Sequence, residues 1–457
     1  MVKDLVFRLG LLNRGEVKLF TQMELATLFF TFSHVHYLRE GGTIVFVMPR
    51  SVLTGAKQHR HFQQKDLGFV RVIDCEDVEP LFNVPSCVIV ARKGAKSNWP
   101  VEAVKVSGCL PVRNLPLEKA REHLLFEEMS FAPPFAKTGP ASPYLDKFIQ
   151  GATIVPRCFW FVRPAAEAWV IDPKRPALET DPEIQKQAKK PWKGLSLSGE
   201  VEADFLFVTL LGADMIPFGY VRQRLVVLPL EVQPDGRGRL ITAEAAVKLG
   251  KIGLANWLRK VEAFWKQLGK GTGRVRTIYQ RLDFNQTLTR QHSASFASLV
   301  YSARGTRIAA CVLTEEEKQN LNVGGLRPKG FIIDHHAYFF ESANPDETHY
   351  LCAVLNAPFI DTYIKPLQTR GLYGPRNIHR APFEALSIPP FDPSDERHVK
   401  LAELSRACHE KVAQAIAEET LPRSGPIGRL RQKVREFLSA ELSEIDCLTR
   451  EILGERE

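Results

Sequence analysis

The sequence predicts an α/β fold, in which the C-terminal part of a doubly wound sheet is followed by a mixed α+β domain and by C-terminal helices. Three observations predict it. Residues 22–40 carry apolar side chains at helical spacing and end at a glycine pair. Residues 43–48 are one continuous apolar run, which is typical of a strand buried on both faces of a sheet. A turn at Pro85 then leads into another apolar run at 87–91.

The other elements predicted in the first region, residues 1–125, also alternate between helix and strand. We expect a helix from Ser51 to Phe62, a short strand from Val70 to Ile73 and a third strand from Cys87 to Ala91. This order is typical of the C-terminal edge of an open α/β sheet. The stretch is too short for a complete doubly wound domain, so residues 1–125 are predicted to be an incomplete one.

The composition changes near residue 126, where proline and glycine become frequent. Short strands are predicted at Ala152 to Val155 and Phe159 to Val162, and a helix at 243–268. The basic loop that follows, GKGTGR, matches no nucleotide-binding motif because it follows a helix and not a strand. A phosphate contact and a plain helix-ending turn both remain open. The polar run 172–194 is predicted to be a solvated loop, and the domain to span 126–395.

The last region, 396–457, contains two amphipathic patterns separated by Pro422 and Pro426. Both predict helices, and the second has near-heptad spacing. These helices pack either against the rest of the protein or against a partner chain, and both alternatives remain open.

Charge and cysteine content indicate which partners and which cellular location are expected. The chain has 457 residues with 61 Lys and Arg against 52 Asp and Glu, a net charge of +9, which favours a polyanionic partner. The eight cysteines form no CxxC pair, which argues against zinc and for reduced thiols in the cytosol. Apolar runs are too short to span a bilayer, and the N-terminus does not have the pattern of a signal peptide. We therefore predict a cytoplasmic location.

No self-contained catalytic constellation is found. The motifs HExxH, GxSxG and GxxxxGK[ST] do not occur. His335 and His336 are adjacent within an apolar stretch read as a strand, so they are expected to point to opposite faces and not to share a metal. We predict no metal site.

Three segments, in order, carry a resemblance to a known family. They are MELATLFFTFSHVHYLREGGTIVFVMPRSVL, VIDCEDVEPLFNVPSCVIVARK and, much later, LCAVLNAPFIDTYIKPLQTRGLYGPRNIHRAPFEALSIPPFDPSDERHVKLAELS. The first two resemble the segments that follow the catalytic loop in the S-adenosylmethionine-dependent, adenine-specific DNA methyltransferases of restriction–modification systems. The third is similar to the end of that family's fused target-recognition domain.

The sequence also departs from the family. The cofactor-binding glycine motif and the catalytic Asn/Asp-Pro-Pro-Tyr/Phe loop occur nowhere, and Asn83-Val84-Pro85-Ser86 has one proline and no aromatic. The resemblance therefore implies a chain that starts after the catalytic loop, as a fragment, a split-gene product or the C-terminal subunit of a two-chain enzyme. We predict no catalytic or cofactor-binding residue, and S-adenosylmethionine only for the complete enzyme.

One residue is expected to contact a flipped base. Enzymes that methylate a base must take it out of the duplex, and the resemblance places Phe82 where the family has an aromatic that stacks on the base. A phenylalanine that closes the hairpin core is the alternative, but Leu81 beside it can fill the core position instead. Both remain open.

Further residues are predicted to contact DNA because they follow a strand end or lie in basic, glycine-rich loops. For each residue alone, a surface salt bridge is the alternative, and as a set they favour DNA. They are Arg50, Ser51, Asn83, Arg290, Gln291, Arg304, Arg307, Gln368, Arg370, Tyr373, Arg376, Asn377 and Arg380.

The leading hypothesis is the DNA-binding, target-recognition portion of an adenine DNA methyltransferase, active only when the missing half is supplied. Its expected partners are double-stranded DNA and an N-terminal methyltransferase half or another restriction–modification subunit. A non-catalytic specificity or scaffold subunit, which binds DNA and a partner chain, is the first alternative. An unrelated α/β enzyme with a novel site is the second.

Overall fold

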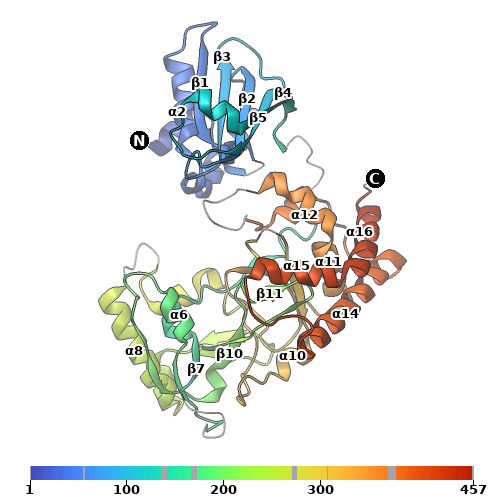
Figure 1. The fold of residues 1–457 in the computed structure, drawn as a ribbon. Coiled ribbons are helices and arrows are strands. Elements are labelled where there is room, and N and C mark those ends of the chain that lie inside the picture. The colour runs from blue at the N-terminus through green and yellow to red at the C-terminus, as the bar shows by residue number, and fades with distance from the viewer. Residues whose placement is uncertain are drawn as a thin grey trace. The chain divides into compact units, whose positions relative to one another are not determined.

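A computed structural model describes residues 2–54, 57–134, 142–165, 172–269, 275–305, 307–368 and 377–454 (Figure 1). The chain divides into two units. Unit 1 comprises Met1–Ala141 with Tyr363–Ala381, and unit 2 comprises Ser142–Thr362 with Pro382–Glu457. Most of the predicted 126–395 domain therefore shares one unit with the 396–457 helices. The segment 363–381, expected within the target-recognition domain, is grouped with the N-terminal region.

Unit 1 is built on a five-stranded sheet with the order β1-β3-β2-β4-β5. Strand β3 is antiparallel to both β1 and β2, β2 and β4 are parallel, and β4 and β5 are antiparallel. The described residues therefore form a mixed sheet in which β1 and β2 run in the same direction and β3 lies antiparallel between them. The prediction that this sheet is the C-terminal part of a doubly wound one stays a prediction. The strands are β1 (Thr43–Pro49), β2 (Phe69–Glu79), β3 (Ser86–Arg92), β4 (Val101–Cys109) and β5 (Leu124–Phe131).

The helices of unit 1 are short. The predicted helix before β1 is α2, and the glycine pair behind it forms a turn in which Gly41 has φ +74°. The predicted helix at 51–62 is wrong in form, since the described residues make two 3-10 turns and one short helix there. The helical elements are α1 (Val2–Arg8), η1 (Arg14–Gln22), α2 (Leu25–His36), η2 (Arg50–Leu53), η3 (Lys57–His59), α3 (Arg60–Gln64), α4 (Leu117–Ala120), η4 (Arg121–His123) and η9 (Lys365–Leu367).

The two faces of this sheet differ. On one face, Phe30 of α2 and Phe62 of α3 contact each other and join Ile89 of β3 in a hydrophobic core. On the other face, Val45 and Val47 of β1 are 57% and 58% exposed. The prediction that this strand is buried on both faces is therefore wrong, because no described element covers the second face at β1.

Unit 2 contains several antiparallel sheets and ribbons. The largest has the order β17-β16-β18-β6, and every residue of its strand β16 is buried. The strands are β6 (Ile149–Gln150), β7 (Val162–Pro164), β8 (Ala177–Thr180), β9 (Ser198–Glu200), β10 (Leu206–Thr209), β11 (Met215–Ile216), β12 (Gly219–Tyr220), β13 (Arg224–Val227), β14 (Leu230–Val232), β15 (Gly238–Leu240), β16 (Ala297–Ser302), β17 (Ala310–Leu313) and β18 (Ala337–Ser342).

Two predicted strands in this unit take other forms. Within 152–155, Ala152 makes only an isolated bridge with Asp334; of 159–162, the first two residues belong to helix α5, Phe161 makes an isolated bridge with Val226, and Val162 begins β7. The helix predicted at 243–268 is broken at Gly250, whose φ of +70° favours glycine.

The helical elements of unit 2 include the predicted C-terminal helices. Helix α14 packs along α11 and α16 contacts both (Figure 1), which favours packing within this protein over the partner-chain alternative. The second predicted helix is divided into α15 and α16 at Leu438. The elements are α5 (Arg157–Trp160), α6 (Pro182–Gln187), η7 (Ala203–Phe205), α7 (Ala243–Lys248), α8 (Ile252–Leu268), α9 (Ile278–Leu282), η8 (Phe284–Gln286), α10 (Glu315–Gln319), α11 (Pro345–Asn356), α12 (Pro358–Ile364), α13 (Ala381–Ala385), α14 (Glu396–Ala417), α15 (Ile427–Phe437) and α16 (Ser439–Leu453). The boundaries between the two units fall within α12, after Thr362, and within α13, after Ala381. Within the described ranges, none of the helices combines the length and the apolar character that crossing a membrane requires.

Candidate nucleic-acid interface

The turn between β2 and β3 lies at one end of the unit 1 sheet. Pro49, the last residue of β1, is paired with Ser86 at the start of β3. The backbone N–H of Arg50 donates to the carbonyl oxygen of Pro85 at 2.8 Å. The turn is therefore fixed beside the C-terminal end of β1, the end at which open α/β sheets bind their ligands.

This turn presents an aromatic side chain to solvent. Phe82 is 55% exposed, and Asn83 beside it is exposed as well. Leu81 packs on a small core that includes Val104 of β4. Of the two alternatives for Phe82, the core phenylalanine is therefore wrong, because Leu81 takes the core position. Stacking on a flipped base stays a prediction.

Arg50 at the end of β1 is occupied by two carboxylates of β2. Its Nη2 lies 3.0 Å from Oδ2 of Asp74, and its Nε lies 3.1 Å from Oε2 of Glu76. Burial opposes the charge of Arg50, but its hydrogen bonds with Asp74 and the charges of both carboxylates outweigh this and raise its pKa. A DNA phosphate would therefore compete with Asp74 for Arg50. Ser51, also predicted to contact DNA, donates its hydroxyl hydrogen to Oε1 of Glu24 at 2.8 Å.

In unit 2, two adjacent predicted DNA contacts have different surroundings. Arg290 is exposed, and its Nη2 donates to Oε1 of Gln286 at 2.7 Å. Gln291 is 1% exposed. Its Oε1 accepts from the N–H of Ile333 at 2.7 Å, and its Nε2 donates to the Ile333 carbonyl at 3.1 Å. The side chain of Gln291 is thus used inside the protein, and a base contact would require it to leave this position.

The remaining predicted contacts belong to both units and differ in their burial. Arg304 is exposed, while Arg307 donates to Oε1 of Gln432. Gln368 is buried, and Asn377 and Arg380 are half-buried and have interactions of their own. Three predicted contacts lie outside the described residues: Arg370, Tyr373 and Arg376.

The paired histidines form a cluster that the sequence pattern does not predict. His335 and His336 lie in a turn before β18 and not within a strand, and their ring centroids are 4.4 Å apart. The prediction that they point to opposite faces is therefore wrong. Their Nδ1 atoms lie 3.2 Å and 3.6 Å from the buried carboxylate of Asp334.

This geometry resembles a metal-ligand set, but a cation of the protein already lies within it. Nη2 of Arg157 is 3.1 Å from Oδ1 of Asp334 and 2.8 Å from Nδ1 of His336. Burial lowers the pKa of His336 to about 4, which leaves its ring neutral and able to accept from Arg157. As arranged, the cluster is a hydrogen-bonded network around a guanidinium group.

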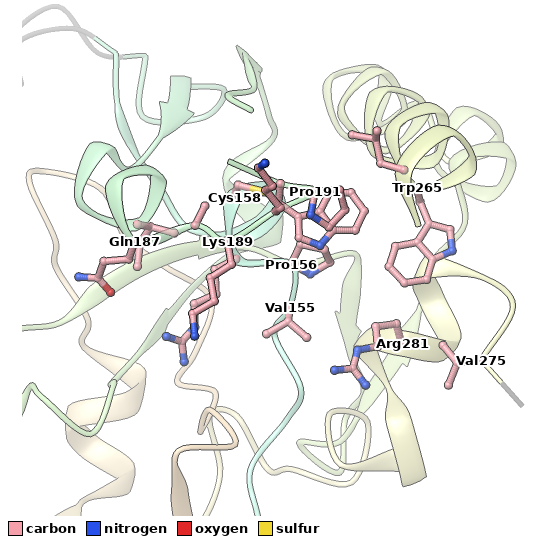
Figure 2. Close-up of a pocket in the computed structure, with 15 residues that line it drawn as sticks. Val155, Pro156, Cys158, Gln187, Lys189, Pro191, Trp265, Val275 and Arg281 are labelled. Atoms are coloured by element: carbon pink, nitrogen blue, oxygen red, sulfur yellow. The ribbon is translucent and has the colours of Figure 1, made fainter. Parts of the chain in front are cut away.

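A cavity of about 940 Å³ in unit 2 was also missed (Figure 2). It combines basic, aromatic and apolar side chains from α5, from the segment after α6, and from α8 and α9. Several of its lining residues, from Ile184 to Trp192, lie in the run 172–194, which was predicted to be a solvated loop. The lining residues are Val155, Pro156, Arg157, Cys158, Ile184, Gln187, Ala188, Lys189, Lys190, Pro191, Trp192, Trp265, Leu268, Val275 and Arg281.

Comparisons with known proteins give a likeness of fold. No family model matches the sequence, and no curated protein matches it. The fold is similar to that of the Type IIL restriction-modification enzyme MmeI in complex with DNA, with a TM-score of 0.58 and 11% sequence identity. That match covers 100% of this chain and 52% of the other, so the chain spans about half the length of that enzyme.

Two further structures match with lower TM-scores. One is the Type IIG restriction endonuclease BpuSI, with a TM-score of 0.27, 13% identity, and coverage of 94% of this chain and 49% of that one. The other is a nuclease-deletion mutant of the Type ISP restriction-modification enzyme LlaGI in complex with a DNA substrate mimic, with a TM-score of 0.38, 10% identity, and coverage of 84% and 36%. At identities this low, the finding is that the whole chain has a fold similar to half of the Type IIL enzyme.

Proposed function

We propose that this chain is the DNA-binding, target-recognition portion of a site-specific adenine DNA methyltransferase of the restriction–modification type. It methylates adenine only when a catalytic half supplies the missing motifs. The ordered sequence resemblance supports this proposal, and so does the fold likeness to a restriction–modification enzyme in complex with DNA.

Phe82 is the single observation that carries the proposal. A phenylalanine that serves only to fold the hairpin is expected to be buried, yet this one is 55% exposed on a turn whose core position is taken by Leu81. The turn is fixed to the end of β1 by the hydrogen bond from Arg50 to Pro85. An exposed aromatic on an anchored turn suits stacking against an extrahelical base.

The methyl donor does not fit this chain. S-adenosylmethionine would need the glycine-rich turn that the sequence lacks. At the end of β1, the guanidinium of Arg50 is held by Asp74 and Glu76. We therefore assign no cofactor-binding residue here, and the donor site belongs to the proposed partner.

The exposure of the second face of the unit 1 sheet is an argument for such a partner. Val45 and Val47 are exposed there, and Val88 and Val90 of β3 lie opposite them in the register. Among the described strands, β1 is paired on one side only. An α/β half that adds a strand to this edge and a helix over these valines would complete the doubly wound arrangement.

Methyl transfer in the presence of that half tests the role of Phe82. The isolated chain should transfer no methyl group from a labelled donor to DNA. With the catalytic half supplied in trans, transfer should appear, and Phe82→Ala should weaken engagement of the flipped base by about 1–3 kcal/mol.

Phe126→Ala is the matched control, because Phe126 of β5 is equally exposed, at 55%, in the same unit. It should leave transfer unchanged. Transfer by the isolated chain, or equal losses in both variants, would contradict the proposal.

The DNA contact is tested without any partner. Duplex binding by the isolated chain should weaken with salt, with log affinity falling against log salt by about 0.9 per neutralised phosphate. The net charge of +9 motivates this expectation. Binding that is undetectable at low salt, or that does not change between low and moderate salt, would remove the basis for a DNA-binding role.

A separate experiment tests whether the exposed face of β1, formed by Val45 and Val47, contacts the catalytic half. Val47→Asp should abolish activation by the catalytic half, because a charge would be buried in the contact. Val112→Asp, at a valine that is 55% exposed elsewhere in unit 1, should not. Equal activation of both variants would show that the partner does not use this face.

A further inference from the structure

The cavity of unit 2 has the size of a small-molecule site. Its volume of about 940 Å³ lies within the range of ligand pockets. In Figure 2, Gln187 and Lys189 lie on one side of the cavity, and Trp265 and Arg281 lie on the other.

The cavity is strongly basic. Four of its lining side chains are cationic, and none is a carboxylate: Arg157, Lys189, Lys190 and Arg281. Arg157 is engaged by Asp334 and His336. Within the described part of the chain, Lys189, Lys190 and Arg281 form no ion pair, so their charges are available to an anionic ligand.

Two tryptophans give the cavity an aromatic platform. The rings of Trp192 and Trp265 are stacked, with centroids 6.0 Å apart and an angle of 5° between the planes. Both side chains are partly buried, and the indole N–H of Trp265 donates to the carbonyl of Arg276 at 3.2 Å, which fixes its orientation. Because the two rings are already in stacking contact, a third planar group would extend the stack and not enter it.

We propose that this cavity binds a nucleotide, with the base stacked on the tryptophan pair and the phosphate held by Lys189, Lys190 and Arg281. A planar apolar group linked to an anion matches the combination of stacked rings and unpaired cations. The ligand is either a free nucleotide or an unpaired nucleotide of a DNA strand, which share this chemistry. The proposal needs neither methyl transfer nor the Phe82 turn.

Calorimetric titration of the full chain tests it. The ligands are the four deoxynucleoside monophosphates, deoxyadenosine without phosphate, inorganic phosphate, a short single-stranded oligonucleotide and a blunt duplex. At least one monophosphate or the single strand should bind at least tenfold more tightly than either deoxyadenosine or inorganic phosphate alone. Binding of the monophosphate identifies a free nucleotide as sufficient, and binding of the single strand alone identifies an unpaired nucleotide within a strand.

Variants assign the binding to the cavity. Arg281→Gln should weaken it at least fivefold, and Trp265→Leu should weaken it roughly five- to 150-fold. Arg281 is half-buried without an ion pair among the described residues, so its replacement leaves the core intact even if Trp265→Leu destabilises the fold. Lys248→Gln, at an exposed lysine at the end of α7, is the matched control and should bind like the unmodified chain.

Three results would overturn the proposal: no binding of any nucleotide or single strand, binding that Arg281→Gln leaves unchanged, or equal affinity for nucleotide and inorganic phosphate. Duplex binding with a steep salt dependence that persists in Arg281→Gln would leave the DNA-binding proposal intact. The two proposals can therefore fail separately.

Discussion

Two strands that are rich in apolar residues have different surroundings in the two units. Strand β1 of unit 1 reads TIVFVMP, and β16 of unit 2 reads ASLVYS, with serines at its second and last positions. Every residue of β16 is buried, between the neighbouring strands β17 and β18. In β1, Ile44 and Met48 are buried, while Val45 and Val47 are more than half exposed.

The difference shows that an apolar strand sequence does not reveal whether the same chain covers both faces of the strand. Apolar residues along a whole strand are typical of a strand that is covered on both faces, and β16 is covered in this way by described residues. In β1, the second face, which carries Val45 and Val47, is not covered by any described element. An apolar face with no cover in the same chain is expected to be a contact surface, which is why the comparison bears on the proposed partner.

The largest effect expected from this comparison is in the core of unit 2. Leu299 of β16 is fully buried and lies opposite Val312 and Phe340 in the register. Leu299→Ala should lower the free energy of unfolding by about 2–5 kcal/mol, because it removes buried methylenes and leaves a cavity. Denaturant unfolding of the isolated chain measures it.

Val47→Ala in β1 is the counterpart. It should cost less than about 1 kcal/mol, since the side chain is 58% exposed. Similar losses for both variants would mean that the second face of β1 is covered in solution, and the comparison would no longer hold.

The next largest effect is a dependence on pH that arises in unit 2. Burial lowers the pKa of His349 to about 3 and of His409 to about 4. His409 donates from Nδ1 to the carbonyl of Ser405 and accepts at Nε2 from the N–H of Val312, so a second ring proton would displace a hydrogen bond.

Between about pH 6.5 and pH 4 the unfolded chain binds protons that the folded chain does not, so the free energy of unfolding falls as the pH is lowered. We expect a contribution of about 1–3 kcal/mol from each of these two histidines between pH 7 and pH 4.5. His409→Gln should flatten the profile, and His123→Gln, at an exposed histidine, should not. Parallel profiles for all three proteins would contradict the prediction.

A comparable effect is expected at the end of the unit 1 sheet. Arg50→Met removes the guanidinium that Asp74 and Glu76 share, and these two side chains are only 13% and 20% exposed. It should cost about 1–3 kcal/mol of unfolding free energy. Arg71→Met is the control, because the pair of Arg71 with Glu128 is 42% and 74% exposed and should contribute about 0–1 kcal/mol. Equal costs would show that the Arg50 pair is not structural.

The smallest expected effect concerns Phe82. Phe82→Ala should change the free energy of unfolding by less than about 0.5 kcal/mol, because the ring is largely exposed and Leu81 supplies the core contact. Thermal or denaturant unfolding of the isolated chain measures this. A loss comparable with that of Leu299→Ala would return Phe82 to a core role and weaken the proposed function.

Local patterns were sufficient for some elements and not for others. Helix α2 and strands β1 and β3 follow from spacing and from the glycine and proline between them. Strands β4 and β5, which extend the sheet, were not anticipated. Strand β5 in particular is exposed at all but its two ends, so no buried period marks it.

The candidate sites depend on contacts between distant segments, which local patterns do not contain. Nothing beside Gln291 shows that its amide is bonded to Ile333 across the fold. Trp192 and Trp265 are far apart in the chain and meet only in the folded structure. For Phe82, the sequence left an exposed and a core position open, and the contact of Leu81 with the core around Val104 decides between them.

The free edge of β1 also has a consequence for how the chain behaves in concentrated solution. Among the described strands it offers a row of backbone donors and acceptors beside exposed valines, which is a template for strand pairing between molecules. Without a partner, the chain should therefore self-associate as its concentration rises, and its solubility should improve when the edge is capped. The same edge that we assign to assembly is the part of the surface most prone to aggregation.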